Sequence, residues 1–263
     1  MEFPLSSQIG ANFEFVPQTG STNADLVAQA ADLPDFSVLV AGFQSAGRGR
    51  AGRDWLAPAG SSLFVSVLLK PKNLLPSRFS WLPLLAGLAM TKTVAHFVSD
   101  RAVSLKWPND VLVSEQKISG VLSELIADQS GVVIGAGLNI LQSKEELPIA
   151  TATSLVIEGA SNFSRDSNFL DEILESYLKN LKALYSAWVE AGGDAVLSGL
   201  RSEVIAACST IGRGEVKAIL PGDKELFAEA IGIDDTGRLI LQPAGSKDVT
   251  AVAAGDIVHL RHN

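Results

Sequence analysis

Two apolar runs separated by a loop rich in arginine and glycine constrain the fold of this chain most strongly. Residues 36–43 (FSVLVAGF) and 61–70 (SSLFVSVLLK) have the β-branched and apolar composition of buried strands. Between them, residues 42–55 (GFQSAGRGRAGRDW) contain three arginines and four glycines. This connection is too long for a tight hairpin turn, and long loops in compact domains are commonly functional.

The arginines are a local positive feature of an acidic chain, whose formal net charge is -8. Glycine allows backbone N–H groups to converge on an anion, and arginine adds bidentate hydrogen bonds to phosphate or carboxylate. The alternatives are a solvent-exposed loop or a contact to RNA. The net charge and the lack of interleaved aromatic residues disfavour RNA. Composition alone leaves a small-anion site and a solvent-exposed loop both open.

The 263 residues are 47% hydrophobic and 19% charged, which is enough for a large packed domain and a small one. Residues 77–100 and 164–193 have helical spacing, and four short strands follow one another within residues 102–141. From about Ile211, short alternating strands and turns predict a small all-β barrel. We therefore expect an α+β domain over residues 1–210 and a barrel over 211–263.

The sequence shows neither a targeting signal nor a membrane-spanning segment, and this bears on the expected location of the protein. The N-terminal MEFPLSSQIG lacks the features of a signal peptide, and the apolar WLPLLAGLAM is too short to span a membrane. Cys208 is the single cysteine and is expected to be a buried apolar residue. We expect a cytoplasmic protein without a membrane partner.

Two polar motifs lie at predicted strand ends. LKWPND (105–110) brings Lys106, Asn109 and Asp110 to a turn, where Asp110 could help to hold Mg²⁺. KISG (117–120) places Lys117 where it could neutralise a carboxylate or a phosphoryl oxygen. Taken singly, LKWPND is better explained by ordinary turn residues and KISG by a solvent-exposed lysine at a strand edge.

Two further stretches suit a ligand. GSTNADL (20–26) offers the capping residues Ser21, Thr22 and Asn23 at a helix start. They either cap the helix only or accompany free N–H groups that bind a polar or anionic ligand. GAGLN (135–139) ends a strand with small residues before Asn139, which permits either a planar ligand or close strand packing.

Together and in this order, the motifs closely resemble the biotin–protein ligase family. The matching stretches are STN (21–23), QSAGRGRAGRDW (44–55), KWPNDVLV (106–113), KISGVLSE (117–124) and GAGLNI (135–140). The C-terminal region also resembles the small SH3-like barrel of that family. The resemblance implies an α+β fold, with a class II synthetase-like mixed sheet, flanking helices and this barrel.

The resemblance implies a two-step reaction. Biotin and ATP form biotinyl-5′-adenylate, with Mg²⁺ as cofactor, and a lysine of a carrier domain then takes the biotinyl group. The implied partner is the biotin carboxyl carrier domain of an acetyl-CoA, acyl-CoA or pyruvate carboxylase. The first step brings two anions together, which accounts for a concentration of positive charge in the arginine loop.

The resemblance also implies the roles of individual residues. Lys117 is expected to be the main catalytic residue, with Arg50 retaining the adenylate and Asp110 positioning phosphates and Mg²⁺. The biotin head group is expected to contact Ser21, Thr22, Asn23 and Gln44. The remaining expected binding residues are Gly47, Arg48, Gly49, Arg53, Trp55, Lys106, Asn109, Gly120, Gly137, Asn139 and Arg261, with Trp55 and Asn139 near adenine.

The chain departs from some family members. Only twenty residues precede Ser21, too few for a helix-turn-helix domain, so we expect no nucleic-acid partner. Ala51 and Asp54 make this loop less basic than in some relatives. The alternatives are a lipoate–protein ligase or octanoyltransferase, whose loop pattern differs, and a non-catalytic nucleotide- or RNA-binding module. The sequence leaves the oligomeric state open.

Overall fold

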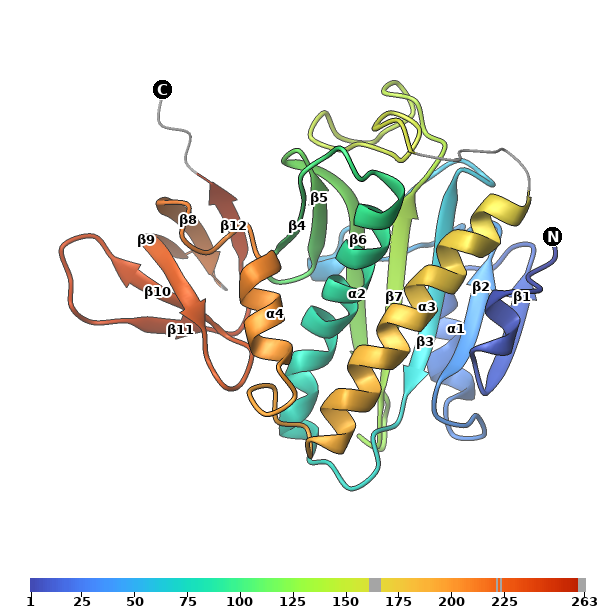
Figure 1. Ribbon diagram of the computed structural model, residues 1–263, viewed down its shortest axis with the longest axis horizontal. Helices are drawn as coiled ribbons and strands as arrows, with labels where there is room; N and C mark the ends of the chain where they lie inside the picture. The colour runs from blue at the N-terminus through green and yellow to red at the C-terminus, as the bar shows by residue number, and fades with distance from the viewer. Residues whose placement is uncertain (161–166, 221, 223, 260–263) are drawn as a thin grey trace.

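The larger of two sheets is mixed and has seven strands in the order β1-β2-β3-β7-β6-β5-β4 (Figure 1). The computed structural model describes residues 1–160, 167–220, 222 and 224–259. The strands are β1 (Asn12–Val16), β2 (Ser37–Ala41), β3 (Ser62–Leu69), β4 (Val103–Lys106), β5 (Asp110–Val113), β6 (Gln116–Leu125) and β7 (Val132–Asn139). Only β1 and β2 run parallel, and every other neighbouring pair is antiparallel. The predicted strands on both sides of the arginine loop are confirmed as β2 and β3.

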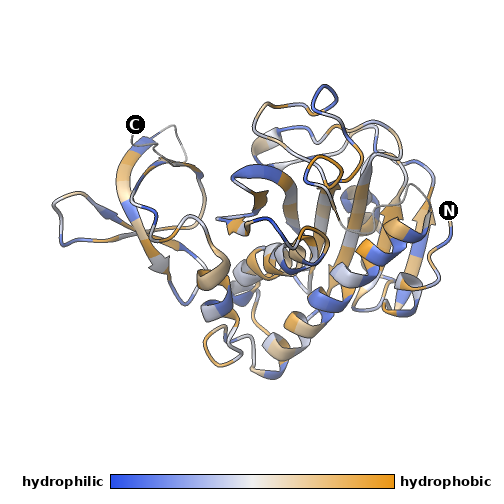
Figure 2. Cartoon of the chain, turned by 45° about the horizontal axis from the view of Figure 1, so that its top comes forward, coloured by the Kyte–Doolittle hydropathy of each residue, from blue (hydrophilic) through white to orange (hydrophobic). Residues whose placement is uncertain are grey.

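Helices cover both faces of this sheet. The described helices are α1 (Thr22–Gln29), α2 (Leu82–Phe97), α3 (Ser167–Glu190) and α4 (Leu200–Ala207), with 3₁₀ turns η1 (Ser6–Gln8), η2 (Arg50–Gly52) and η3 (Pro76–Trp81). Side chains alternate along a strand, so Val38 and Val40 of β2 join the main core under α2 and α3. Leu39 joins a smaller core with Leu26 of α1 on the opposite face. In Figure 2 the strands of the larger sheet are mainly hydrophobic.

Both long helices predicted from the sequence are present. The first predicted range, 77–100, divides into η3 and α2. Residues 164–166 of the second range lie outside the described residues, and α3 occupies the rest of it up to Glu190. Gly192 and Gly193, which follow α3, both have positive φ angles that favour glycine. No helix in the described ranges combines the length and the hydropathy that crossing a membrane requires.

The smaller sheet is antiparallel and lies beside the larger one (Figure 1). Its strands are β8 (Glu215–Leu220), β9 (Lys224–Ile233), β10 (Leu239–Pro243), β11 (Thr250–Val252) and β12 (Asp256–His259), in the order β11-β10-β9-β8-β12. This arrangement is consistent with the SH3-like fold expected for the C-terminal region. The domain boundary after residue 210 stays a prediction.

Two buried tryptophans dock the smaller sheet against the larger domain. The turn that joins β9 to β10 accepts hydrogen bonds from the Nε1–H of Trp81, to Asp235 O at 2.8 Å, and of Trp107, to Gly237 O at 3.2 Å. The core formed by α2 and α3 continues into the smaller sheet through side chains such as Ala218. The two sheets therefore share one hydrophobic core, and the predicted burial of Cys208 at their junction is confirmed.

Because only one of two fully buried tryptophans takes part in this docking, we expect their substitutions to lower the free energy of unfolding by different amounts. Trp81 and Trp188 are both fully buried, but the Nε1–H of Trp188 has no hydrogen-bond partner among the described residues. Trp81→Phe leaves the Asp235 carbonyl without its donor, whereas Trp188→Phe breaks no such bond. We expect Trp81→Phe to lower the free energy of unfolding by about 1–2 kcal/mol more than Trp188→Phe. Urea unfolding measures both, and equal losses would contradict the proposed docking.

Candidate functional site

The arginine loop folds back on itself as a short hairpin between β2 and β3. Arg48 and Asp54 form an antiparallel bridge, and the Trp55 N–H donates to Gly47 O at 2.9 Å. The tip is the 3₁₀ turn η2, in which Ala51 has a φ of 54°. This fold places the arginines over the same face of the sheet that α1 covers.

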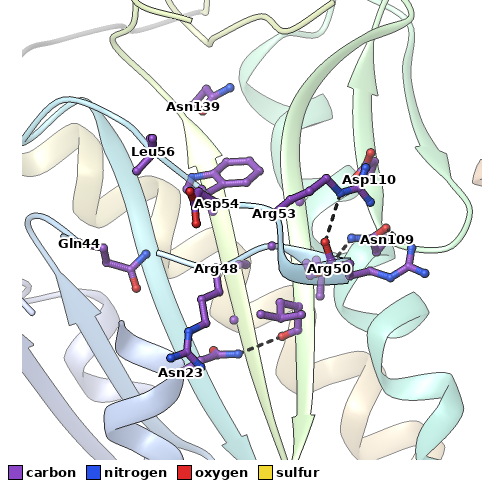
Figure 3. A pocket seen from close by; sticks show the side chains of 18 of the residues that line it. Asn23, Gln44, Arg48, Arg50, Arg53, Asp54, Leu56, Asn109, Asp110 and Asn139 are labelled. Atoms are coloured by element: carbon purple, nitrogen blue, oxygen red, sulfur yellow. Dashed lines mark hydrogen bonds between the residues drawn. The ribbon is translucent and has the colours of Figure 1, made fainter. Parts of the chain in front are cut away.

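A cavity of about 310 Å³ lies between this hairpin, the N-terminus of α1 and strands β6 and β7. Figure 3 shows Asn23 and Gln44 on one side of it and Asn109 and Asp110 on the other. The predicted site residues that line the cavity are Ser21, Thr22, Asn23, Gln44, Arg48, Gly49, Arg50, Arg53, Trp55, Asn109, Asp110, Lys117, Gly120, Gly137 and Asn139. Gly47 and Lys106 do not line it, and Arg261 lies outside the described residues.

Glycines on β6 and β7 make room for the Trp55 indole. A Cβ added to Gly137 would come within 2.6 Å of Trp55 Cε2, and one added to Gly120 within 2.9 Å of Cζ3. Likewise, a Cβ on Gly135 would overlap the Asn23 side chain. The floor of the cavity therefore depends on three positions that lack a side chain. The Trp55 Nε1–H is buried there with no hydrogen-bond partner among the described residues.

Lys117 reaches the cavity because the pairing of β5 with β6 shifts by one residue. Val111 pairs with Ser119, whereas the next residue, Leu112, pairs with Lys117. The unpaired residue is Ile118, which is fully buried in the main core. An extra residue of this kind changes which face the following side chains occupy. The Lys117 Nζ consequently lies 3.4 Å from where a Cβ of Gly120 would stand, on the cavity face.

Acidic and amide groups hold the cations at this end of the cavity. The Lys117 Nζ lies 2.6 Å from Asp110 Oδ1. The Arg50 Nη1–H donates to Asn109 Oδ1 at 3.0 Å, and Arg53 pairs at 3.0 Å with Asp256 of β12. The smaller sheet thus contributes a carboxylate beside the arginine loop.

Burial affects two of the nearby cations. It lowers the pKa of the Arg50 guanidinium, an effect that the charge of Asp256 opposes. It also lowers the pKa of Lys106, against the attraction of Asp110. A bound anion would favour the charged form of both groups.

The opposite end of the cavity presents mainly hydroxyl and amide groups. The Thr22 N–H donates to Gln44 Oε1 at 2.7 Å, which fixes the orientation of the glutamine amide. The Asn23 Nδ2 donates to Glu124 Oε2 at 2.8 Å. Glu124 and the buried Ser66, which contacts both Thr22 and Asn23, were not predicted as site residues. Leu56 and Ile149 at the cavity lining were not predicted either, and only their apolar character could have indicated them.

The residues present fit a magnesium ion only when phosphates supply most of its ligands. In the described parts of the chain, no group of three or more His, Cys, Asp or Glu side chains could hold a metal ion. Asp110 is a single carboxylate and is paired with Lys117. Magnesium is commonly bound through one or two carboxylates together with substrate phosphates and water.

The cavity as a whole suits a ligand with a polar head that forms hydrogen bonds and an anionic tail. Thr22, Asn23 and Gln44 offer donors and acceptors for the head. Lys117 and the arginines of the hairpin lie where an anionic group would be stabilised by several positive charges in a partly buried site.

Comparisons with known proteins agree with this arrangement. Residues 13–139 match the Biotin/lipoate A/B protein ligase family, and residues 210–260 match the Biotin protein ligase C terminal domain. The chain is 40% identical over 252 residues to a biotin--[acetyl-CoA-carboxylase] ligase of Mycobacterium tuberculosis, which covers 94% of this chain and 89% of that protein. It is 31% identical to the bifunctional ligase/repressor BirA of Escherichia coli, over 90% of this chain and 71% of that one.

The fold also matches a solved structure. The biotin protein ligase from Aquifex aeolicus in complex with biotin and ATP superimposes with a TM-score of 0.71 and 28% identity, covering 94% of this chain and 98% of that one. The sequence matches extend over both sheets and include the residues that meet around the cavity. The chain therefore belongs to the biotin protein ligase family.

Proposed function

We propose that this chain activates biotin with ATP to form biotinyl-5′-adenylate and then transfers the biotinyl group to a lysine of a carrier protein. The observation that carries the proposal is the position of Lys117. Its Nζ lies in a cavity that has hydroxyl and amide groups at one end and Arg50 with Asn109 at the other. The similar proteins described above are biotin ligases, which favours biotin over lipoate as the acid.

In the first step, a carboxylate oxygen of biotin attacks the α-phosphorus of ATP. The bond from that phosphorus to the bridging oxygen breaks, and pyrophosphate leaves. Lys117 and Arg50 would reduce the repulsion between the two anions and stabilise the charge that develops on the α-phosphoryl oxygens. Asn109, which accepts a hydrogen bond from Arg50, would hold that guanidinium in place. Asp110 would help to position Mg²⁺ and the phosphates.

In the second step, the amine of the carrier lysine attacks the activated carbonyl carbon, and AMP leaves. The amine must lose a proton, and Asp110 is the carboxylate nearest to Lys117 that could accept it. We assign the carrier to the biotin carboxyl carrier domain of an acetyl-CoA, acyl-CoA or pyruvate carboxylase. The cytoplasmic location and the absence of nucleic-acid and membrane partners stay predictions from the sequence.

Biotin-dependent exchange between ATP and radiolabelled pyrophosphate tests the first step directly. We expect exchange with biotin, none with lipoate or octanoate, and a loss of about a hundredfold or more in Lys117→Ala, because an electrostatic stabiliser is removed. Lys92→Ala serves as a matched control, since Lys92 pairs with Glu203 on the surface, away from the cavity. Exchange with lipoate in place of biotin would overturn the assigned substrate, and no exchange with any acid would overturn the ligase assignment.

The glycine floor of the cavity generates a second prediction. In Gly137→Ala the new Cβ would displace the Trp55 indole, and we propose that this indole lies near the adenine of ATP. We expect the KM for ATP to rise by about tenfold, because overpacking costs on the order of 1–3 kcal/mol.

The matched control is Gly232→Ala on β9, where an added Cβ meets only the Ile240 Cδ1, at 3.8 Å. Steady-state kinetics with ATP as the varied substrate measure both variants. An unchanged KM in Gly137→Ala would show that Trp55 does not help to bind the nucleotide.

A further inference from the structure

A buried chain of hydrogen bonds runs behind the polar end of the cavity. Ser66 is fully buried on β3, and its Oγ lies 2.7 Å from Asn23 Oδ1 and 2.7 Å from Thr22 Oγ1. The last acceptor in this series of hydrogen bonds is Glu124 Oε2, 2.8 Å from Asn23 Nδ2. Neither Ser66 nor Glu124 lines this cavity, although Glu124 lines a second one with Arg48 and Leu122. Ser66 can therefore act on a ligand only through Thr22 and Asn23.

The number of available hydrogen atoms determines which group donates in each of these hydrogen bonds. The carboxylate of Glu124 only accepts, so the Asn23 amide must present its Nδ2 to Glu124 and its Oδ1 to Ser66. The Leu122 carbonyl, 3.4 Å from the same Nδ2, favours the same orientation. Asn23 Oδ1 cannot donate, and therefore the single hydroxyl hydrogen of Ser66 belongs to this contact.

The Thr22 hydroxyl hydrogen then has two possible acceptors. Ser66 Oγ lies at 2.7 Å, whereas Gln44 Oε1 lies at 3.0 Å and already accepts the Thr22 N–H. Ser66 Oγ is the nearer acceptor, and its own hydrogen is already directed to Asn23. The Thr22 hydroxyl therefore donates to Ser66 Oγ. Every donor in the chain then points toward the negative charge of Glu124.

We propose that Ser66 and Glu124 are positioning residues that make the Thr22 hydroxyl a hydrogen-bond acceptor in the cavity. With its hydrogen turned to Ser66, Thr22 presents lone pairs to the ligand. Gln44, whose Oε1 is taken by the Thr22 N–H, has its amide N–H groups left to donate. An acceptor beside a donor matches the adjacent N–H and C=O groups of a cyclic urea. This inference rests on the proposed function, because biotin carries such a ureido ring.

Binding of biotin without ATP, measured by isothermal titration calorimetry, tests the positioning role. We expect Ser66→Ala to weaken biotin and desthiobiotin, which share the ureido ring, by about tenfold, because a buried polar partner is lost. In pyrophosphate exchange, the KM for biotin should rise while kcat and the KM for ATP stay unchanged. Ser37→Ala is the matched control, since Ser37 is a fully buried strand serine whose hydroxyl donates to Pro34 O.

A second readout separates positioning from a general loss of packing. Biotin methylated at a ureido nitrogen lacks the N–H that Thr22 accepts, so the protein with native Ser66 and Glu124 should discriminate strongly against it. Ser66→Ala removes the acceptor at 2.7 Å, which leaves the Thr22 hydrogen to be shared between Gln44 Oε1, at 3.0 Å, and the ligand, and should lower that discrimination ratio. Glu124→Gln should lower this ratio too, because a glutamine allows the Asn23 amide to turn over and the directions of the hydrogen bonds to reverse. Glu124 is only partly buried, which keeps this variant informative if Ser66→Ala does not fold.

Two results would overturn this inference and leave the proposed function standing. One is an unchanged affinity for biotin in both variants, and the other is an equal loss of affinity for biotin and for the methylated analogue. If the protein with native Ser66 and Glu124 fails to bind biotin at all, the proposed function fails and this inference fails with it.

Discussion

The site depends on one irregularity in strand β6, which contributes side chains to the core on one face of the sheet and to the cavity on the other. Side chains of a regular strand alternate, so Lys117 and Gly120 would face opposite sides. The one-residue shift at Ile118 places them on the same side, while Ile118 and Val121 both remain in the core beneath α2 and α3. The same shift therefore keeps the apolar face closed and brings the ammonium group into the cavity. Without it, Lys117 would be an unpaired charge in the core, which is strongly unfavourable.

Charge balance follows from that geometry. Two of the cations around the cavity form ion pairs with carboxylates of this chain: Lys117 with Asp110, and Arg53 with Asp256 of the smaller sheet. The Arg53–Asp256 pair is about half exposed on both sides, so it contributes only about 0–1 kcal/mol and exchanges readily. An anionic substrate can thus compete for the arginine hairpin at little cost. An acidic chain can in this way keep a local positive site without repelling its substrates.

Much of this arrangement could be predicted from the sequence, because it is encoded in local patterns. Apolar runs indicated β2 and β3, and most of the motif residues of the family resemblance meet around one cavity. Contacts between distant strands were not predictable in the same way. Ser66 lies within an apolar run and was not distinguished from the core. Neither the shift at Ile118 nor the contact of Asp256 with Arg53 has a local signature, since both depend on strand pairing and domain docking.

A crystal structure with a non-hydrolysable sulfamoyl analogue of biotinyl-5′-adenylate tests the central claim most directly. The account predicts the ureido ring beside Thr22 and Gln44, the sulfamoyl group within hydrogen-bond distance of Lys117 Nζ, and the adenine near Trp55. A ligand bound with the ureido ring at the Lys117 end, or bound outside the cavity, would contradict it.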